Sequence, residues 1–150
     1  MKIVHVVECF AGGVFSFLSN LTNELDKEEY IVIYGINRDN TPNNFKEKFP
    51  LNTKFIPWKS ANRSLNPLKD IKALWELYVI LKKIDDIDII HLHSSKAGFL
   101  GRIVSFLLGK SSKTIYTPHA ISFLRLDVSV KKERYLFGWK NLLVILVEKL

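Results

Sequence analysis

The chain of 150 residues is long enough for one domain with a buried core, and its hydrophobic content of 47% excludes a disordered protein. The formal net charge of +7 indicates an anionic partner, but the scattered basic residues lack the interleaved aromatic residues of a nucleic-acid binder. A single cysteine, Cys9, excludes an intramolecular disulfide, and no apolar run reaches the roughly 20 residues of a membrane span, so we expect a cytoplasmic protein.

The first part of the chain predicts three strands and one helix. A β-branched run predicts a buried strand over Lys2 to Val7, and apolar residues at helical spacing after Gly12-Gly13 predict a helix. Further strands are expected over Tyr30 to Ile36 and over Lys54 to Trp58. The polar, proline-containing segment 41–51 between them predicts a loop with one helical turn at most.

The second part predicts two helices and two strands. Asn66-Pro67 is a typical helix start, with asparagine as N-cap, and the helix it opens is expected to run to about Ile84. A strand over Asp88 to Leu92, a helix over Gly98 to Leu108 and a strand over Lys113 to Thr117 follow. The apolar side of the Asn66 helix is predicted to consist of Leu68, Ile71, Leu74, Trp75, Tyr78 and Leu81.

This alternation predicts the α/β class, with a Rossmann-like, doubly wound parallel sheet in the order 3-2-1-4-5. In that order the first and fourth strands lie side by side at the point where the chain reverses direction. The loops Glu8 to Gly13 and His93 to Ala97 should then face each other across a crevice, which His119 joins from the fifth strand. Ligands of open α/β sheets bind in such a crevice.

We expect residues 1–150 to form a single Rossmann-like domain. The last helical pattern, Lys131 to Leu150, stops without a glycine, a proline or a polar tail. Natural domains seldom end inside an apolar helical pattern. The sequence therefore predicts the front half of a longer protein.

The glycine pair Gly12-Gly13 has two readings. Either the backbone approaches a ligand closely there, or a turn between strand and helix needs a positive φ. The spacing does not match the G-x-G-x-x-G fingerprint, and no acidic residue ends the second strand, which argues against a nicotinamide-dependent dehydrogenase.

Ser94, Ser95 and Lys96 combine hydroxyl groups, free backbone N–H groups and a cation where a helix is expected to begin. That set suits a phosphate, a carboxylate or sugar hydroxyls. The alternative is an ordinary serine N-cap that satisfies the first helical turn.

The histidines near the strand ends are candidates for chemistry. His91 and His93 point to the same face of their strand, but a metal site would need a further ligand from among His5, Cys9 and His119. We therefore expect hydrogen-bonded histidines and no metal. His119, held by the preceding proline, is predicted to donate to a substrate oxygen or exchange a proton, with a structural cap as the alternative.

The aromatic residues are predicted to lie mostly in the core. Trp58 and Trp75 are expected to be buried. Phe15 and Phe17 cannot share one helical face, so one of them is expected to be exposed. An exposed aromatic beside basic residues would suit a membrane interface.

Taken together, these motifs resemble a known family. The segments are Met-Lys-Ile-Val-His-Val-Val-Glu8, Gly12-Gly13-Val14, His91-Leu-His-Ser-Ser-Lys-Ala-Gly-Phe-Leu-Gly-Arg102 and Thr117-Pro-His119. In this order they resemble the N-terminal half of a GT-B glycosyltransferase of family 4, the retaining enzymes common in bacterial capsule and exopolysaccharide synthesis.

The resemblance implies a division of labour between two domains. The N-terminal domain holds a saccharide or lipid-linked acceptor. A C-terminal domain, absent from this chain, binds the nucleotide-sugar and carries a pair of glutamates seven residues apart. Gly12 and Gly13 would approach the donor diphosphate, and His119 would be the catalytic residue that contacts the transferred sugar. The acceptor side would be lined by Ser94, Ser95 and Lys96.

By the same resemblance, no metal or other cofactor is implied, this piece alone is inactive, and the enzyme works in the cytoplasm or at the inner face of the cell membrane. Two positions depart from the family pattern. Ala120 stands where a glycine or aspartate often follows the histidine, and Phe15, Ser16 and Phe17 replace an acidic residue after the glycine pair.

Two other functions fit the same sequence. A nucleotide-sugar epimerase of the same fold would use carboxylates as acid and base, and Glu8 is the one carboxylate at the predicted strand ends. A non-catalytic module that binds sugar phosphates or a partner protein is the other alternative.

Overall fold

The structure is a computed structural model that describes residues 1–36, 41–62 and 66–119. The predicted helix over Lys131 to Leu150 and the departure at Ala120 lie outside the described residues. Residues Met1 to His119 form one compact unit.

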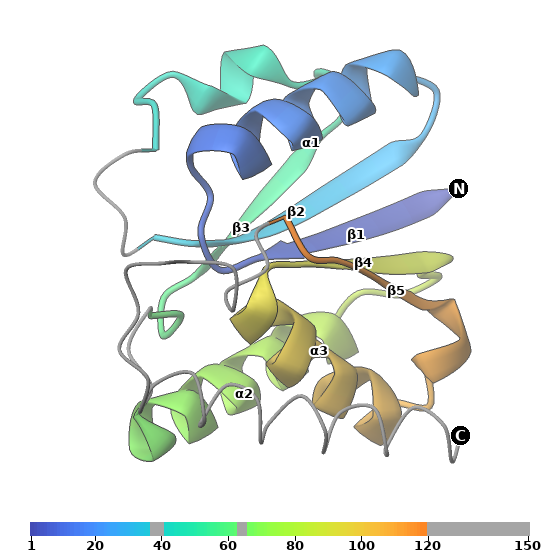
Figure 1. The fold of residues 1–150 in the computed structure, drawn as a ribbon. Helices are drawn as coiled ribbons and strands as arrows, with labels where there is room; N and C mark the ends of the chain where they lie inside the picture. The colour runs from blue at the N-terminus through green and yellow to red at the C-terminus, as the bar shows by residue number, and fades with distance from the viewer. Residues whose placement is uncertain (37–40, 63–65, 120–150) are drawn as a thin grey trace. The chain divides into compact units, whose positions relative to one another are not determined.

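A parallel sheet of five strands forms the centre of this unit, in the order β3-β2-β1-β4-β5 (Figure 1). The predicted strand order and the α/β Rossmann-like class are therefore confirmed. Strands β1 and β4 are hydrogen-bonded neighbours, as the doubly wound arrangement requires. The strands are β1 (Lys2–Val7), β2 (Glu29–Gly35), β3 (Lys54–Trp58), β4 (Ile89–His93) and β5 (Thr114–Thr117).

Helix α1 (Gly12–Glu24) covers one face of the sheet, whereas α2 (Pro67–Lys82) and α3 (Ser95–Leu107) cover the other (Figure 1). Asn66 caps α2 as predicted, since its side chain accepts a hydrogen bond from the backbone N–H of Lys69 at 3.2 Å. Helix α3 begins three residues earlier than Gly98, the predicted start. Short 3-10 turns, η1 (Phe45–Lys48) and η2 (Ser111–Lys113), complete the connections. None of the helices in the described ranges is long and apolar enough to cross a membrane.

Successive side chains along each strand point to opposite faces of the sheet, and an apolar layer therefore forms on each face. Side chains such as Val4, Ile33 and Leu92 point toward α2 and α3 and form the larger cluster of buried residues. Phe10 and Leu18 belong to a second cluster on the side of α1. His5, paired in register with His91, lies on this second face of the sheet.

The predicted apolar side of α2 is partly wrong. Leu68, Ile71 and Trp75 are exposed, with Trp75 at 66%, whereas Ala73, Leu77 and Leu81 are buried. The helix is apolar around most of its circumference, so its pattern could not select a face. The small Ala73 faces the sheet, and the indole Nε1 of the buried Trp58 donates to its carbonyl oxygen at 2.9 Å. Trp58 is therefore a core residue, as predicted, and Trp75 is not.

Gly35, the last residue of β2, lies against the end of β1. A Cβ atom at this position would collide with the backbone carbonyl oxygen of Glu8. We expect Gly35→Ala to lower the free energy of unfolding by about 2 kcal/mol, because backbone atoms can move away only if two strand ends shift. Urea unfolding of the purified protein measures this.

Gly13→Ala is the matched control, because in the described part of the chain no atom beyond its own helix and its chain neighbours lies within 4 Å of the position that its Cβ would take. That variant should be unchanged or slightly more stable, as alanine is favoured over glycine in a helix. Equal stability of the two variants would contradict the predicted collision.

Candidate functional site

The candidate site lies at the carboxyl ends of β1, β4 and β5. Strands β1 and β4 pair so that His5 lies beside His91 and Val7 beside His93. His119 follows β5 by two residues and comes within hydrogen-bond distance of His93. The predicted meeting of strand ends therefore brings together four histidines, although His5 was considered only as a candidate metal ligand.

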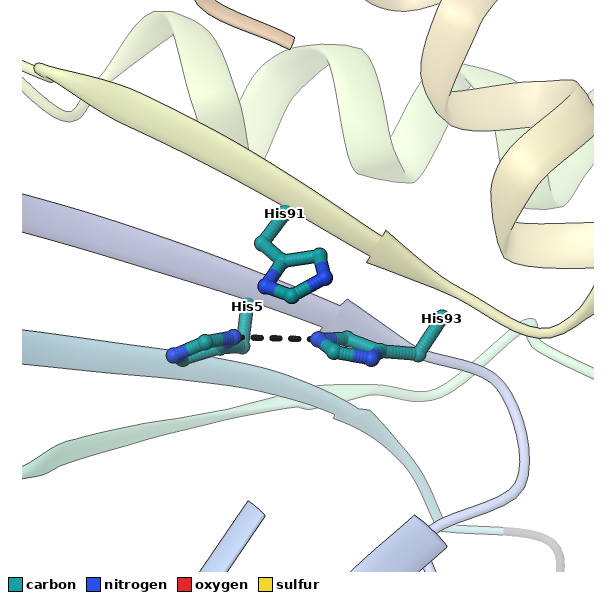
Figure 2. Close-up of side chains that lie close together, drawn as sticks. All are labelled: His5, His91 and His93. Carbon is teal, nitrogen blue, oxygen red and sulfur yellow. Dashed lines mark hydrogen bonds between the residues drawn. The ribbon is translucent and has the colours of Figure 1, made fainter. Parts of the chain in front are cut away.

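Three of these histidines form a continuous hydrogen-bonded row, here called the histidine chain: His5, His93 and His119. Nδ1 of His5 lies 3.0 Å from Nε2 of His93, and the dashed line in Figure 2 marks this contact. Nδ1 of His93 lies 2.7 Å from Nε2 of His119. Both ring nitrogens of the fully buried His93 are therefore engaged.

His91 lies beside the histidine chain, but its own hydrogen bond is to a residue outside that chain. Its Nε2 lies 2.8 Å from Oγ1 of Thr117, and its ring centroid is 4.0 Å from that of His93. Figure 2 shows the His91 ring above the pair formed by His5 and His93. His91 thus packs against the chain while its hydrogen bond leads to β5.

Burial keeps these imidazoles neutral. Burial, and to a smaller extent the neighbouring His91, lowers the pKa of His5 to about 3. Burial, and to a smaller extent His119, lowers the pKa of His91 to about 4. Burial and the neighbouring histidines lower the pKa of His93 as well, and burial lowers that of His119. At neutral pH each ring therefore carries one N–H donor and one acceptor nitrogen.

His5, His91 and His93 are also the residues that could hold a metal ion, because each offers a ring nitrogen and these atoms all lie within 4.8 Å of one another. Three imidazoles are a common ligand set for Zn²⁺. A metal between His5 and His93 would need the same nitrogens that now bond to each other. The absence of a metal stays a prediction.

Phe17 is a contact of His119 that the sequence did not reveal. Its ring meets the His119 ring edge to face, with centroids 4.8 Å apart. Phe17 is 39% exposed, whereas Phe15 packs against Phe10, so the prediction that one of the two phenylalanines is exposed is confirmed. The first turns of α1 and the segment after β5 therefore lie next to each other, as the predicted crevice requires.

Ser94 has an unusual backbone between β4 and α3. Its φ of 73° and ψ of 162° fall in a region that is essentially restricted to glycine. Its hydroxyl makes no capping hydrogen bond, and Oγ is buried without a partner among the described residues. The ordinary N-cap reading therefore does not account for this serine, and backbone strain of this kind is typical of functional sites.

We expect Ser94→Gly to raise the free energy of unfolding by about 1 kcal/mol. Glycine removes the strain and the unpaired hydroxyl, and these gains exceed the added entropy of the unfolded chain. Chemical denaturation measures the change. The control Ser95→Gly lies within the first turn of α3 and should lose stability. A destabilised Ser94→Gly variant would disprove the strain.

Ser95 and Lys96 make contacts away from the histidine chain. Ser95 lies near the hydroxyl of Tyr116, where it partly offsets the rise that burial causes in the pKa of this tyrosine. Nζ of Lys96, with 11% of its side chain exposed, lies 2.7 Å from Oδ1 of Asp70 in the first turn of α2. The structure thus places the Lys96 charge beside a carboxylate. Its predicted role toward a ligand stays a prediction.

The glycine pair is compatible with both of its readings. Gly12 has a φ of +55°, as the turn reading predicts. Both glycines are exposed, and among the described residues no atom outside their own helix and their chain neighbours lies within 4 Å of where a Cβ would stand on either. A ligand therefore has room to approach the backbone here.

Comparison with known proteins gives a consistent picture. The model of the family described as Glycosyltransferase Family 4 matches residues 11–146. An uncharacterized 41.2 kDa protein in the cps region of Klebsiella pneumoniae is 28% identical over 140 residues, which cover 91% of this chain and 36% of that protein. A UDP-Gal:alpha-D-GlcNAc-diphosphoundecaprenol alpha-1,3-galactosyltransferase of Escherichia coli is 45% identical over 69 residues, or 46% of this chain and 17% of that enzyme. The chain therefore spans about a third or less of either relative.

Proposed function

Because the chain belongs to glycosyltransferase family 4, we propose that its residues form the acceptor-side part of an enzyme that transfers a sugar from a nucleotide-sugar donor. The acceptor is a saccharide or a lipid-linked saccharide, and the reaction belongs to capsular or exopolysaccharide biosynthesis. The anomeric configuration of the sugar is retained. A following domain, of the GT-B type, binds most of the donor.

One observation carries this proposal: the histidine chain ends in His119 at the carboxyl edge of the sheet. Its Nε2 is held by His93, which leaves Nδ1 as the ring nitrogen for a substrate. Phe17 supports the ring from α1, the helix that Gly12 opens. A ligand diphosphate at the glycine pair would therefore lie near the imidazole.

The charge of the chain and the name of one relative both favour substrates that carry a diphosphate. The name of the Escherichia coli relative gives UDP-Gal as donor and a GlcNAc-diphosphoundecaprenol as acceptor. Both are diphosphates, and the net charge of +7 favours anionic ligands. We infer a nucleoside diphosphate hexose as donor and a polyprenyl diphosphate sugar as acceptor. We therefore propose that the enzyme works at the inner face of the cell membrane, and we expect no nucleic acid as a partner.

The residues divide into three roles. The exposed backbone at Gly12 and Gly13 approaches the donor diphosphate, assisted by the positive N-terminal end of α1. His119 contacts the transferred sugar. The start of α3 faces the acceptor, and the side chains there are Ser94, Ser95 and Lys96. None of these roles requires a metal ion or an organic cofactor.

The test uses the whole protein, purified with its following domain, together with UDP-hexoses and a polyprenyl diphosphate-linked N-acetylhexosamine. We expect transfer to the lipid-linked sugar, with an α-linked product from an α-linked donor. Residues 1–150 alone should bind acceptor without transfer. Isomerisation of the sugar without an acceptor would identify an epimerase instead, and binding without any turnover would identify a non-catalytic module.

A further inference from the structure

The histidine chain has a direction. A neutral imidazole has one N–H and one unprotonated nitrogen, so each contact in the row joins a donor to an acceptor. His93 uses both nitrogens, at 3.0 Å to His5 and at 2.7 Å to His119. Only two arrangements satisfy both contacts. In one, each ring donates toward His119, and in the other, each ring donates toward His5.

The surroundings of His5 distinguish the two arrangements. Its other nitrogen, Nε2, is buried and has no hydrogen-bond partner among the described residues. Tyr30 stacks on the His5 ring, but its hydroxyl donates to the carbonyl oxygen of Leu25 at 2.7 Å. His91, the other ring beside His5, bonds to Thr117. If each ring of the histidine chain donated toward His5, Nε2 of His5 would carry a buried N–H without an acceptor. Folded proteins rarely tolerate such a group.

We propose that His5 and His93 are positioning residues that fix His119 in the tautomer with the proton on Nδ1. His5 donates from Nδ1 to His93, and His93 donates from Nδ1 to Nε2 of His119. His119 therefore presents an N–H to the substrate. This inference rests on the proposed function for the identity of the substrate, but the tautomer itself follows from the contacts within the protein.

The consequence concerns the chemistry of His119. With Nε2 occupied as an acceptor, the ring cannot take a proton from the substrate through its outward nitrogen, which is already protonated. It acts as a fixed donor to a sugar or phosphate oxygen, and such a preorganised donor stabilises negative charge that develops there. A general-base role for His119 is excluded by the same arrangement.

Nitrogen-15 NMR of the whole protein, labelled on histidine, tests the tautomer directly. Protonated and unprotonated ring nitrogens differ strongly in chemical shift, and His119→Gln identifies the signals of His119. At neutral pH we expect the shift of a protonated Nδ1 and of an unprotonated Nε2. A protonated Nε2 in the unmodified protein would overturn the proposal, whatever the variants do.

Two substitutions at His5 form a matched pair. His5→Asp replaces the donor near the position of Nδ1 by an acceptor, which draws the N–H of His93 to its Nε2 and should move His119 toward the Nε2-protonated tautomer, with kcat lowered about tenfold, the value of about one hydrogen bond, and little change in the donor KM. His5→Asn places an amide N–H near the position of Nδ1 and should restore both the tautomer and kcat. A His119 tautomer that is the same in all three proteins would overturn the role of His5.

A bound metal ion is the remaining alternative to the hydrogen-bonded histidine chain, and the metal content of the purified protein tests it. If the purified protein holds one zinc ion that a chelator removes, and the His5 and His93 signals move on removal, the three neighbouring histidines form a metal site and the proposal fails. The proposed function fails separately. In that case the tautomer is as expected, but the whole protein transfers no sugar.

Discussion

Replacing His119 by alanine in the whole enzyme should lower kcat/KM for sugar transfer about 100-fold or more. Among the four histidines of the site, His119 is the only one that is not buried, and His93 leaves its Nδ1 for a substrate. Loss of a donor that acts in the transition state typically costs a factor of this size. His119 is half-buried at the edge of the sheet, so the variant should fold. Initial rates with a labelled nucleotide-sugar, together with the unfolding midpoint, separate the two effects.

Two conservative variants refine this result. His119→Asn carries an amide near the position of Nδ1, the nitrogen assigned to the substrate, whereas His119→Gln carries it near Nε2, the nitrogen held by His93. We expect the asparagine variant to be the more active of the two. Full activity of His119→Ala would contradict the assigned role, and a more active glutamine variant would reverse the roles of the two nitrogens.

Acidification should unfold the protein well above the pH at which carboxylates titrate. The pKa of His5 is about 3 in the folded state and about 6.5 in the unfolded chain, so below pH 6.5 the unfolded state binds more protons. The contribution of neutral His5 to the free energy of unfolding is fully present above pH 6.5. It is lost as the pH decreases toward the pKa of His5 in the folded state. His5 alone accounts for about 1.4 kcal/mol per pH unit, and His91 and His93 add to the slope.

Urea unfolding at several values between pH 7.5 and about pH 5 measures this slope before Asp and Glu contribute. The control is His5→Asn, in which the group no longer titrates. Its slope should be shallower by about 1.4 kcal/mol per pH unit, whatever its stability at pH 7.5. A free energy of unfolding that is level over this range in the unmodified protein would show that the buried histidines are protonated in the folded state.

Much of the fold could be predicted because its signals are local. The β-branched runs, the Asn66-Pro67 helix start and the alternation of strands with helices each depend on neighbouring residues. Right-handed crossovers then leave few strand orders, and the observed order is the predicted one. The exposed face of α2 could not be predicted, since the helix is apolar on several sides and only the fit of Ala73 against Trp58 selects one.

The sequence by itself determined which strand ends meet, and therefore that Gly12, Ser94 and His119 belong to one region of the molecule. Only the tertiary structure decided how their atoms are used. The pairing of β1 with β4 places His5 beside His91 and within reach of His93, residues that lie far apart in the chain. The rotamers then decide which nitrogen of His119 remains for a ligand, and the sharp turn after β4 holds Ser94 in a glycine-like conformation. Contacts between distant segments decide these features, so no local sequence pattern records them.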